Sequence, residues 1–207
     1  RAHHFEIIND KVVVISGEAE TIFFEKKNIG NEKLDQSIIQ NNIKEVLSET
    51  NSRLIGIRDI YYEDNKIYIS MLSENERGIT INAYQADLSF EKLVFKDFFI
   101  TDHYWGGYNV YSGGRLEKFK DNKILFSIGF QNMWPAAQSL ENTLGKIIAV
   151  DKDTSSFEFI SIGHRNPQGL KYLNKENIII NTEHGPKGGD EININYIDKN
   201  NGNLPNY

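Results

Sequence analysis

The sequence contains an internal repeat, and this repeat limits the folds open to the chain more than any other feature does. Four times, a short strand-like segment leads through a turn rich in Asp, Asn and Lys into a β-branched segment. Equivalent positions in the four copies are 55, 57 and 54 residues apart, at Lys11, Lys66, Lys123 and Asn177. Such turns suit tight hairpins, and the β-branched segments suit buried strands. The repeat therefore predicts four antiparallel units of similar design.

Further strands complete the second and third units, at residues 80–84, 93–95, 146–150 and 157–160. Four strands in a repeat of roughly 40–50 residues or slightly more are typical of a β-propeller blade. A parallel α/β fold would need a long helix after each strand, and the sequence lacks such helices. We therefore predict an all-β chain that folds as a β-propeller of four-stranded antiparallel blades. It is expected to form one domain, 1–207, with units of roughly 1–50, 51–108, 109–163 and 164–207.

The fourth unit is shorter than the others. It ends soon after the segment 193–197, without an evident outer strand. Propellers have about 4–8 blades and close into a ring. We therefore expect about four blades that are part of a larger ring, in a chain truncated at its C-terminal end.

One helix is expected between Asn31 and Ser48, where apolar residues recur at helical spacing. These residues are Leu34, Ile38, Ile39, Ile43, Val46 and Leu47. The helix would interrupt the first unit or link it to the second.

The composition excludes several other classes of protein. The 207 residues include 23 Lys and Arg against 29 Asp and Glu, a net charge of −6, whereas nucleic-acid binding relies on clustered basic residues. The absence of cysteine excludes disulfides, thiolate metal sites and a cysteine nucleophile. No apolar run reaches the roughly 18 residues of a membrane span. We therefore predict neither a nucleic-acid partner nor a membrane span.

Two polar loops contain the residues best suited to chemistry. Residues 163–169 read Gly-His-Arg-Asn-Pro-Gln-Gly, and residues 183–191 read Glu-His-Gly-Pro-Lys-Gly-Gly-Asp-Glu. Both follow predicted strands, at ends from which propellers present residues to their channel. Arg165 offers a planar set of donors for a carboxylate, and the carbonyls and carboxylates of the second loop suit Ca²⁺ rather than Zn²⁺. Ordinary blade-connecting loops with solvated charges are an equally good interpretation of this composition.

These two loops also carry a family resemblance. The segments GHRNPQGL and EHGPKGGDEIN, together with GGRL at 113–116 and QSLENTLGKIIAV at 138–150, resemble the soluble quinoprotein sugar dehydrogenases. This glucose/sorbosone dehydrogenase-like family forms six-bladed propellers that bind pyrroloquinoline quinone (PQQ) and calcium. The resemblance covers roughly residues 52–207.

The resemblance implies a cofactor site made by both loops. Arg165 and Asn166 would contact the quinone or the substrate. The backbone carbonyls of Gly185 and Pro186 would hold the calcium ion that polarises the quinone.

The resemblance also implies a second calcium and reveals two departures. Glu191 would ligate a structural calcium, and Tyr207, in what resembles the start of an N-Y-G-W stretch, would be a further ligand. The position of the family's catalytic histidine is occupied by Tyr111, and that of its carboxylate partner by Phe130. A tyrosine side chain is protonated at pH 7 and is a poor general base.

Three functions follow as hypotheses. The first is a PQQ- and calcium-dependent dehydrogenase that oxidises a sugar or alcohol and passes electrons to an acceptor. The second is a non-catalytic calcium-binding propeller that serves as a binding or scaffold module, which the residues at 111 and 130 favour. The third, a lactonase-type propeller, is weaker because no matching set of side-chain metal ligands is visible. The resemblance implies a periplasmic or secreted protein.

Overall fold

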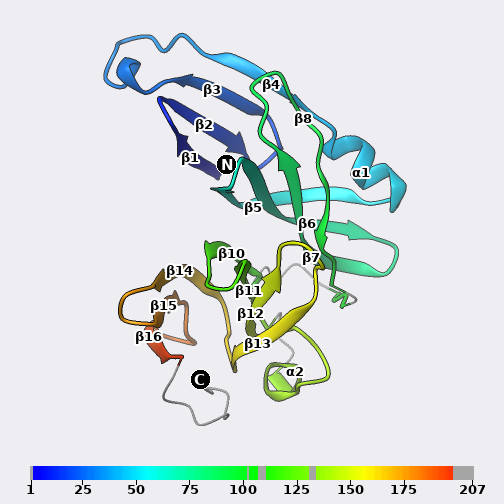
Figure 1. Ribbon diagram of the computed structural model, residues 1–207. Coiled ribbons are helices and arrows are strands. Elements are labelled where there is room, and N and C mark those ends of the chain that lie inside the picture. The colour runs from blue at the N-terminus through cyan, green and yellow to red at the C-terminus, as the bar shows by residue number, and fades with distance from the viewer. Residues whose placement is uncertain (1, 102, 107–110, 131–133, 198–207) are drawn as a thin grey trace. The chain divides into compact units, whose positions relative to one another are not determined.

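The computed structural model describes residues 2–101, 103–106, 111–130 and 134–197, whose strands form four sheets (Figure 1). The chain divides into two compact units, Arg1–Ile100 and Thr101–Tyr207, which are described separately below. From here on, the first and second units are these two compact units and not the repeats of the sequence. Each unit contains two sheets, and all but one of the strand pairs are antiparallel. The predicted all-β class and the four-stranded antiparallel design are confirmed.

The first unit contains a five-stranded sheet and a four-stranded sheet. The first has the order β1-β2-β3-β4-β8, with β1 (His3–Ile8), β2 (Lys11–Ser16), β3 (Thr21–Glu25), β4 (Ser37–Asn41) and β8 (Lys92–Leu93). The second has the order β5-β6-β7-β9, with β5 (Arg53–Glu63), β6 (Lys66–Asn75), β7 (Gly78–Asp87) and β9 (Lys96–Phe99). A 3-10 helix, η1 (Lys26–Asn28), follows β3, and α1 (Ile43–Glu49) leads from β4 to β5.

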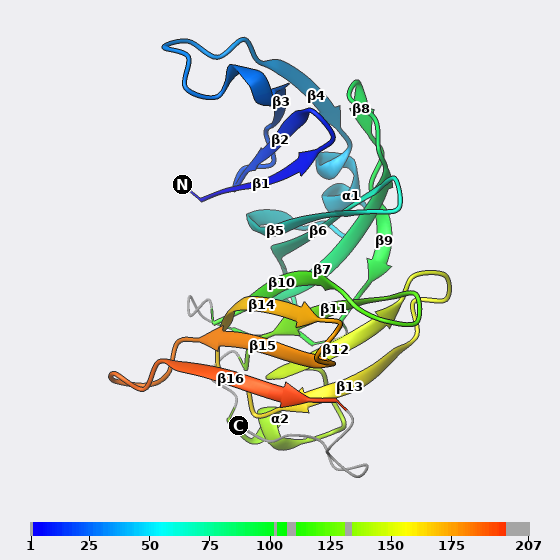
Figure 2. The same cartoon turned by 60° about the vertical axis from the view of Figure 1, so that its left-hand side comes forward.

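The second unit contains a four-stranded sheet and a three-stranded sheet. The first has the order β10-β11-β12-β13, with β10 (Gly113–Lys118), β11 (Lys123–Ile128), β12 (Lys146–Asp151) and β13 (Phe157–Ile162). The second has β14 (Pro167–Leu173), β15 (Ile178–Glu183) and β16 (Glu191–Tyr196), and β14 lies beside β10 (Figure 2). The helix α2 (Trp134–Gln138) precedes β12. In the described parts of both units, no helix is long and apolar enough to cross a membrane.

The hairpin turns that mark the sequence repeat are present. Asp64 and Asn65 join β5 to β6, and Asp121 and Asn122 lie between β10 and β11; their φ angles are 50°, 59°, 55° and 61°. Asn9, between β1 and β2, has a φ of 54°. Asn and Asp tolerate this left-handed backbone better than other residues with a side chain. The repeat seen in the sequence is thus a repeat of hairpin geometry.

The helix predicted over residues 31–48 is partly wrong. Residues Ser37–Asn41 form β4, paired with β3, and only Ile43–Glu49 form α1. Ile38 is 76% exposed while Ile39 is 1% exposed, so the two side chains lie on opposite faces of a strand. Pairing with β3 stabilises the extended form of a segment whose apolar spacing is also compatible with a helix.

The strand predicted at residues 93–95 is also placed differently. The sequence predicts it as part of the second repeat, 51–108. Instead, Lys92–Leu93 form β8, which pairs in parallel with β4 of the five-stranded sheet. The outer strand of the second sheet is β9. The Asn42 side chain fixes this crossing, because its amide donates to the carbonyl of Phe95 at 3.0 Å and accepts from the Phe95 N–H at 2.7 Å.

Each unit has an apolar core that holds its loops in place. Ile15 and Ile69 are fully buried in the core of the first unit. Ile147 and Ile179, from different sheets, are fully buried in the core of the second. Burying one such side chain stabilises the fold by roughly 1.5–3 kcal/mol relative to leaving it exposed.

A buried lysine supports the segment that precedes β12. The ammonium of Lys146, a fully buried residue, donates to the carbonyls of Ala136, Ala137 and Leu144 at 2.9, 2.9 and 2.6 Å. Burial lowers the pKa of Lys146 to about 8. The Ala137 carbonyl also accepts from the N–H of Gly163 at 3.1 Å, so this segment is bonded to the start of the first polar loop.

Replacing Asn42 with alanine should destabilise the first unit by roughly 1–3 kcal/mol, because the Phe95 backbone would lose both of its side-chain partners. Chemical denaturation of Asn42→Ala measures this loss. The control is Gln40→Ala, at an exposed position in β4, which should change the unfolding free energy by less than about 0.5 kcal/mol. Equal stabilities for the two variants would contradict the role given to Asn42.

Candidate functional site

The candidate site lies in the second unit, where the loop between β13 and β14 meets the loop between β15 and β16. Glu183, the last residue of β15, joins them. Its carboxylate accepts hydrogen bonds from the backbone N–H groups of Arg165 at 2.8 Å and Asn166 at 3.3 Å. It also accepts from the side-chain amide of Asn193 in β16 at 2.7 Å. The backbone of the first loop is therefore fixed by a side chain of the second sheet.

His164 completes the buried network around Glu183. Its Nδ1 lies 3.0 Å from Oε1 of Glu183, and its Nε2 lies 2.6 Å from Oγ of Ser161. Because the carboxylate can only accept, Nδ1 of His164 donates to Glu183. Burial raises the pKa of Glu183, but the bonds from His164, Arg165 and Asn166 outweigh it and lower the pKa below its ordinary value.

Ser161, His164 and Glu183 are bonded in the order of a hydrolytic triad. The burial of the serine and the histidine does not fit such a triad. Ser161 and His164 are both 0% exposed. A substrate carbonyl therefore has no access to the serine hydroxyl. The network is a structural support for the loop.

Arg165 lies at the end of an aromatic stack. Its guanidinium carbon is 4.2 Å from the ring centroid of Tyr111. The Tyr111 and Phe130 rings are parallel within 5°, with centroids 6.0 Å apart. The Phe130 N–H also donates to the Arg165 carbonyl at 3.0 Å. Tyr111 and Phe130, where the resemblance predicts the family's base and its partner, are thus brought together, and both contact Arg165.

A glycine permits this close approach. A Cβ atom at Gly129 would overlap the backbone oxygen of Tyr111 and lie 2.9 Å from that of Arg165. The N–H of Gly129 donates to the Ser112 carbonyl at 2.9 Å. Any side chain here would force the segments of the stack apart.

Asn166 is buried and faces its own unit. It is 7% exposed, and its side-chain oxygen accepts from the N–H of Gly113 at 3.3 Å and from the amide of Gln168 at 2.7 Å. These bonds join the first loop to the start of β10. Its predicted contact with a cofactor stays a prediction.

The second loop places carbonyl oxygens around a cation. Nη1 of Arg165 donates to the carbonyls of His184 at 2.8 Å and Gly185 at 2.9 Å. Asp190 accepts from the Gly185 N–H at 3.1 Å, which helps to close the loop. A Cβ atom at Gly185 would overlap the Gly189 carbonyl, so the turn requires glycine.

These carbonyl oxygens are ligands of the kind that a hard cation prefers. Two carbonyl oxygens already converge on a positive charge, and oxygen ligands suit Ca²⁺. The Pro186 carbonyl accepts from the Gly189 N–H at 3.1 Å, and its second lone pair remains suitable for a cation. Among the described residues, no group of three or more His, Cys, Asp and Glu side chains could hold a metal ion.

Of the two residues predicted to bind a second calcium, Glu191 lies within the described residues, and the joint site stays a prediction. Glu191 is exposed, and its carboxylate lies 3.5 Å from the Asn193 side-chain amide. Tyr207 lies outside the described residues. The exposed His184 side chain lies 3.4 Å from the Asp190 carboxylate, beside the loop.

A small cleft opens beside the two loops. Its volume is about 420 Å³, within the range of small-molecule sites. Its lining residues come from the second loop and from the strands β14, β15 and β16: Gln168, Thr182, Glu183, His184, Asp190, Glu191 and Ile192.

Sequence reasoning did not single out Glu183, although the loop positions depend on it. The available signal was a carboxylate at the end of the β-branched segment 178–180. A carboxylate in a strand that is otherwise buried must find hydrogen-bond donors nearby.

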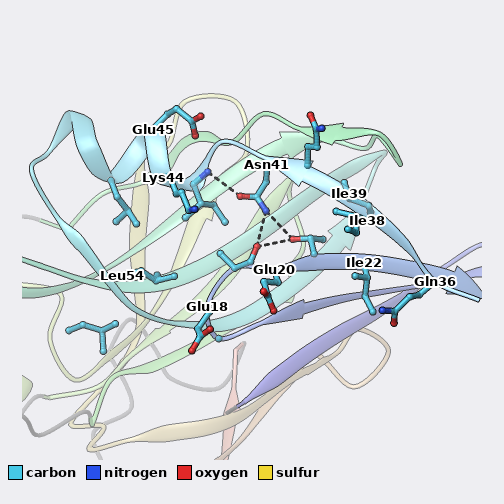
Figure 3. Close-up of a pocket in the computed structure, with 17 residues that line it drawn as sticks. Glu18, Glu20, Ile22, Gln36, Ile38, Ile39, Asn41, Lys44, Glu45 and Leu54 are labelled. Carbon is cyan, nitrogen blue, oxygen red and sulfur yellow. Dashed lines mark hydrogen bonds between the residues drawn. The ribbon is translucent and has the colours of Figure 1, made fainter. Parts of the chain in front are cut away.

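A larger cleft, of about 940 Å³, lies in the first unit between β3, β4, α1 and the start of β5 (Figure 3). Ile38 and Leu54 supply apolar surface, and Glu18, Glu20 and Glu45 add carboxylates. Lys44 also lines this cleft, so its charge is mixed. It contains none of the residues that the resemblance assigns to the cofactor or to calcium.

The successive antiparallel sheets are those of β-propeller blades. The sequence model of the family described as Glucose / Sorbosone dehydrogenase matches residues 25–203. This match covers most of the chain, and the protein belongs to that family. The predicted resemblance is confirmed.

Individual relatives agree with this assignment. Aldose sugar dehydrogenase YliI of Escherichia coli (strain K12) is 36% identical over 103 residues, 44% of this chain and 28% of that protein. A solved glucose dehydrogenase matches with a TM-score of 0.74 and 20% identity, over 99% of this chain and 62% of the other. The PQQ-bound form of Aldose Sugar Dehydrogenase (Adh) from Streptomyces coelicolor matches with a TM-score of 0.63 and 19% identity. This match covers 90% of this chain and 57% of the other.

These matches differ in what they support. The solved structures are too dissimilar in sequence to show more than the shared fold. The chain spans 28% of the length of YliI. It spans 62% and 57% of the two solved chains.

Glu183→Gln should destabilise the second unit by roughly 3 kcal/mol at pH 7, because the buried donors around this side chain lose a carboxylate. Thermal or chemical unfolding measures the loss. Glu176→Gln, at an exposed position between β14 and β15, is the matched control and should be nearly neutral.

The pH dependence gives a second test of Glu183. Its pKa is lowered from 4.5 in the folded state, so the unfolded chain binds this proton first as the pH falls. The stabilisation is complete above the unfolded pKa and is lost as the pH falls through the folded pKa. Wild-type stability should therefore fall more steeply below about pH 4.5 than that of Glu183→Gln. Parallel curves for the two proteins would contradict this assignment.

Proposed function

We propose that this chain is part of a PQQ- and calcium-dependent dehydrogenase that oxidises a sugar or a similar alcohol. The observation that carries the proposal is the placement of Arg165. Its guanidinium is held by Tyr111 and the two carbonyls, while its Nε and Nη2 groups have no acceptor among the described residues. Such a group is suited to a planar ligand that bears carboxylates, as PQQ does.

The proposal extends to calcium. The carbonyls of Gly185 and Pro186 would hold one ion beside the quinone, and Glu191 and Tyr207 would contribute to a second. The convergence of two carbonyls on a positive charge supports the first of these sites. When bound, the quinone accepts a hydride and the cation polarises its carbonyl.

The chain's own residues would bind and orient the reactants. Glu183 and His164 fix the backbone that presents Arg165. Removing a hydride from an alcohol also requires a base to take the hydroxyl proton. The family position of that base is Tyr111, so proton removal is the step for which this chain is least equipped.

A non-catalytic calcium-binding propeller is the second candidate function. The stack of Phe130, Tyr111 and Arg165 favours it, because aromatic rings stand where the family places a base and its partner. Such a module would retain the ligand and cation contacts without turnover. For either function we propose a periplasmic or secreted location on the basis of family membership, and for the dehydrogenase a separate electron acceptor.

Reconstitution of the full-length protein with PQQ and Ca²⁺ tests both functions. The absorbance of the quinone should shift on binding, and aldoses should be oxidised slowly with an artificial electron acceptor. Tyr111→His combined with Phe130→Asp should raise the rate by about tenfold or more, because a positioned base contributes roughly 10²–10⁴-fold. Arg165→Met should weaken the absorbance shift, whereas Lys187→Met, an exposed charge in the second loop, should not.

The outcomes separate the candidates. No absorbance shift and no turnover in any variant would overturn the dehydrogenase proposal. An absorbance shift without turnover, even in the double variant, would favour the non-catalytic module. Measurable oxidation by the wild-type protein would exclude that module.

A further inference from the structure

The most unusual contact in the second unit is between Arg165 and backbone oxygens. A guanidinium usually pairs with a carboxylate when it is held in a fixed position. Here Nη1 donates to the carbonyls of His184 and Gly185 instead, at 2.8 and 2.9 Å. In the part of the chain that the structure describes, no carboxylate forms an ion pair with this side chain.

The other face of the guanidinium is also held. Its carbon lies 4.2 Å from the Tyr111 ring centroid, a distance at which the ring attracts a cation. The Tyr111 ring is supported in turn by Phe130, which is 1% exposed. The arginine is thus fixed from both sides, by aromatic rings and by carbonyl dipoles.

We propose that Arg165 is a built-in cation at the carbonyls of His184 and Gly185, that Tyr111 is the residue that positions it there, and that a divalent cation binds to Gly185 only by displacing it. This inference rests on the proposed calcium site. It goes further because it assigns a resident cation, the Arg165 guanidinium, to the site and makes the metal compete with this cation for the Gly185 carbonyl.

The competition arises because the guanidinium and the metal would both bind the carbonyl oxygen of Gly185. A calcium ion takes oxygen ligands at roughly 2.3–2.6 Å. The Gly185 oxygen already lies 2.9 Å from a guanidinium nitrogen, so two cations on this oxygen would repel at short range. Binding of the metal would release the guanidinium from the carbonyls and leave it free to meet an anionic ligand. The Tyr111 ring opposes that release, because it stabilises the guanidinium in its present position.

Calcium binding to the full-length protein, measured by isothermal titration calorimetry with Ca²⁺ alone, tests the competition. All proteins carry Glu191→Gln, which removes a predicted ligand of the second calcium. Arg165→Met should bind Ca²⁺ at least about tenfold more tightly than the parent, since each factor of ten equals about 1.4 kcal/mol. Lys187→Met is the control for general charge, because it removes one exposed positive charge from the same loop.

Variants at Tyr111 test positioning separately. Tyr111→Leu removes the ring and should tighten Ca²⁺ binding several-fold. Tyr111→Phe keeps the ring and should bind as the parent does. Far-ultraviolet circular dichroism and the unfolding midpoint identify variants that have lost the fold.

Each result decides the inference. Tighter binding by Arg165→Met than by Lys187→Met, with the leucine variant between Arg165→Met and the parent, supports it. Equal affinities in the parent, Arg165→Met and Lys187→Met overturn the competition but leave the proposed calcium site intact. If no variant binds Ca²⁺ at millimolar concentration, the proposed calcium site and the competition are both overturned.

Discussion

The buried carboxylate of Glu183 is the interaction on which the candidate site depends. It receives hydrogen bonds from a histidine, an asparagine and two consecutive backbone N–H groups, so its charge is compensated without a lysine or an arginine. The two N–H groups belong to Arg165 and Asn166, the residues that we propose contact the cofactor. One strand-end residue therefore sets the position of a loop that begins in another sheet. Because unpaired buried donors cost more than a bond contributes, this network has few alternative arrangements.

The surroundings of Arg165 favour binding over proton transfer. A guanidinium, two carbonyls and two aromatic rings attract charged and planar ligands, but none of them accepts a proton near neutral pH. A histidine at position 111 would meet the chemical requirement of alcohol oxidation, and the tyrosine there instead stabilises a cation. We therefore propose a ligand-binding surface whose chemistry differs from that of a dehydrogenase with a histidine base.

Local features of the fold could be predicted from the sequence, and non-local ones could not. The hairpins followed from Asp64-Asn65 and Asp121-Asn122, because those residues adopt the required backbone by themselves. The strand at 37–41 and the parallel pairing of β8 depend on partners distant in sequence. Apolar spacing therefore predicted a helix at the first place, and the repeat predicted another sheet at the second. The two loops were found through family motifs, not through periodicity. Contacts such as Arg165 with Tyr111 join residues far apart in the chain and become visible only in three dimensions.

We propose that the two loops form one cofactor site in which Arg165 contacts the quinone. A crystal structure of the full-length protein with PQQ and Ca²⁺ is the sharpest test of this site. The metal should lie on the Gly185 carbonyl, and the Arg165 guanidinium should have left that oxygen and contact a quinone carboxylate. A quinone bound away from both loops, or a guanidinium that still bridges the His184 and Gly185 carbonyls beside the bound metal, would contradict it.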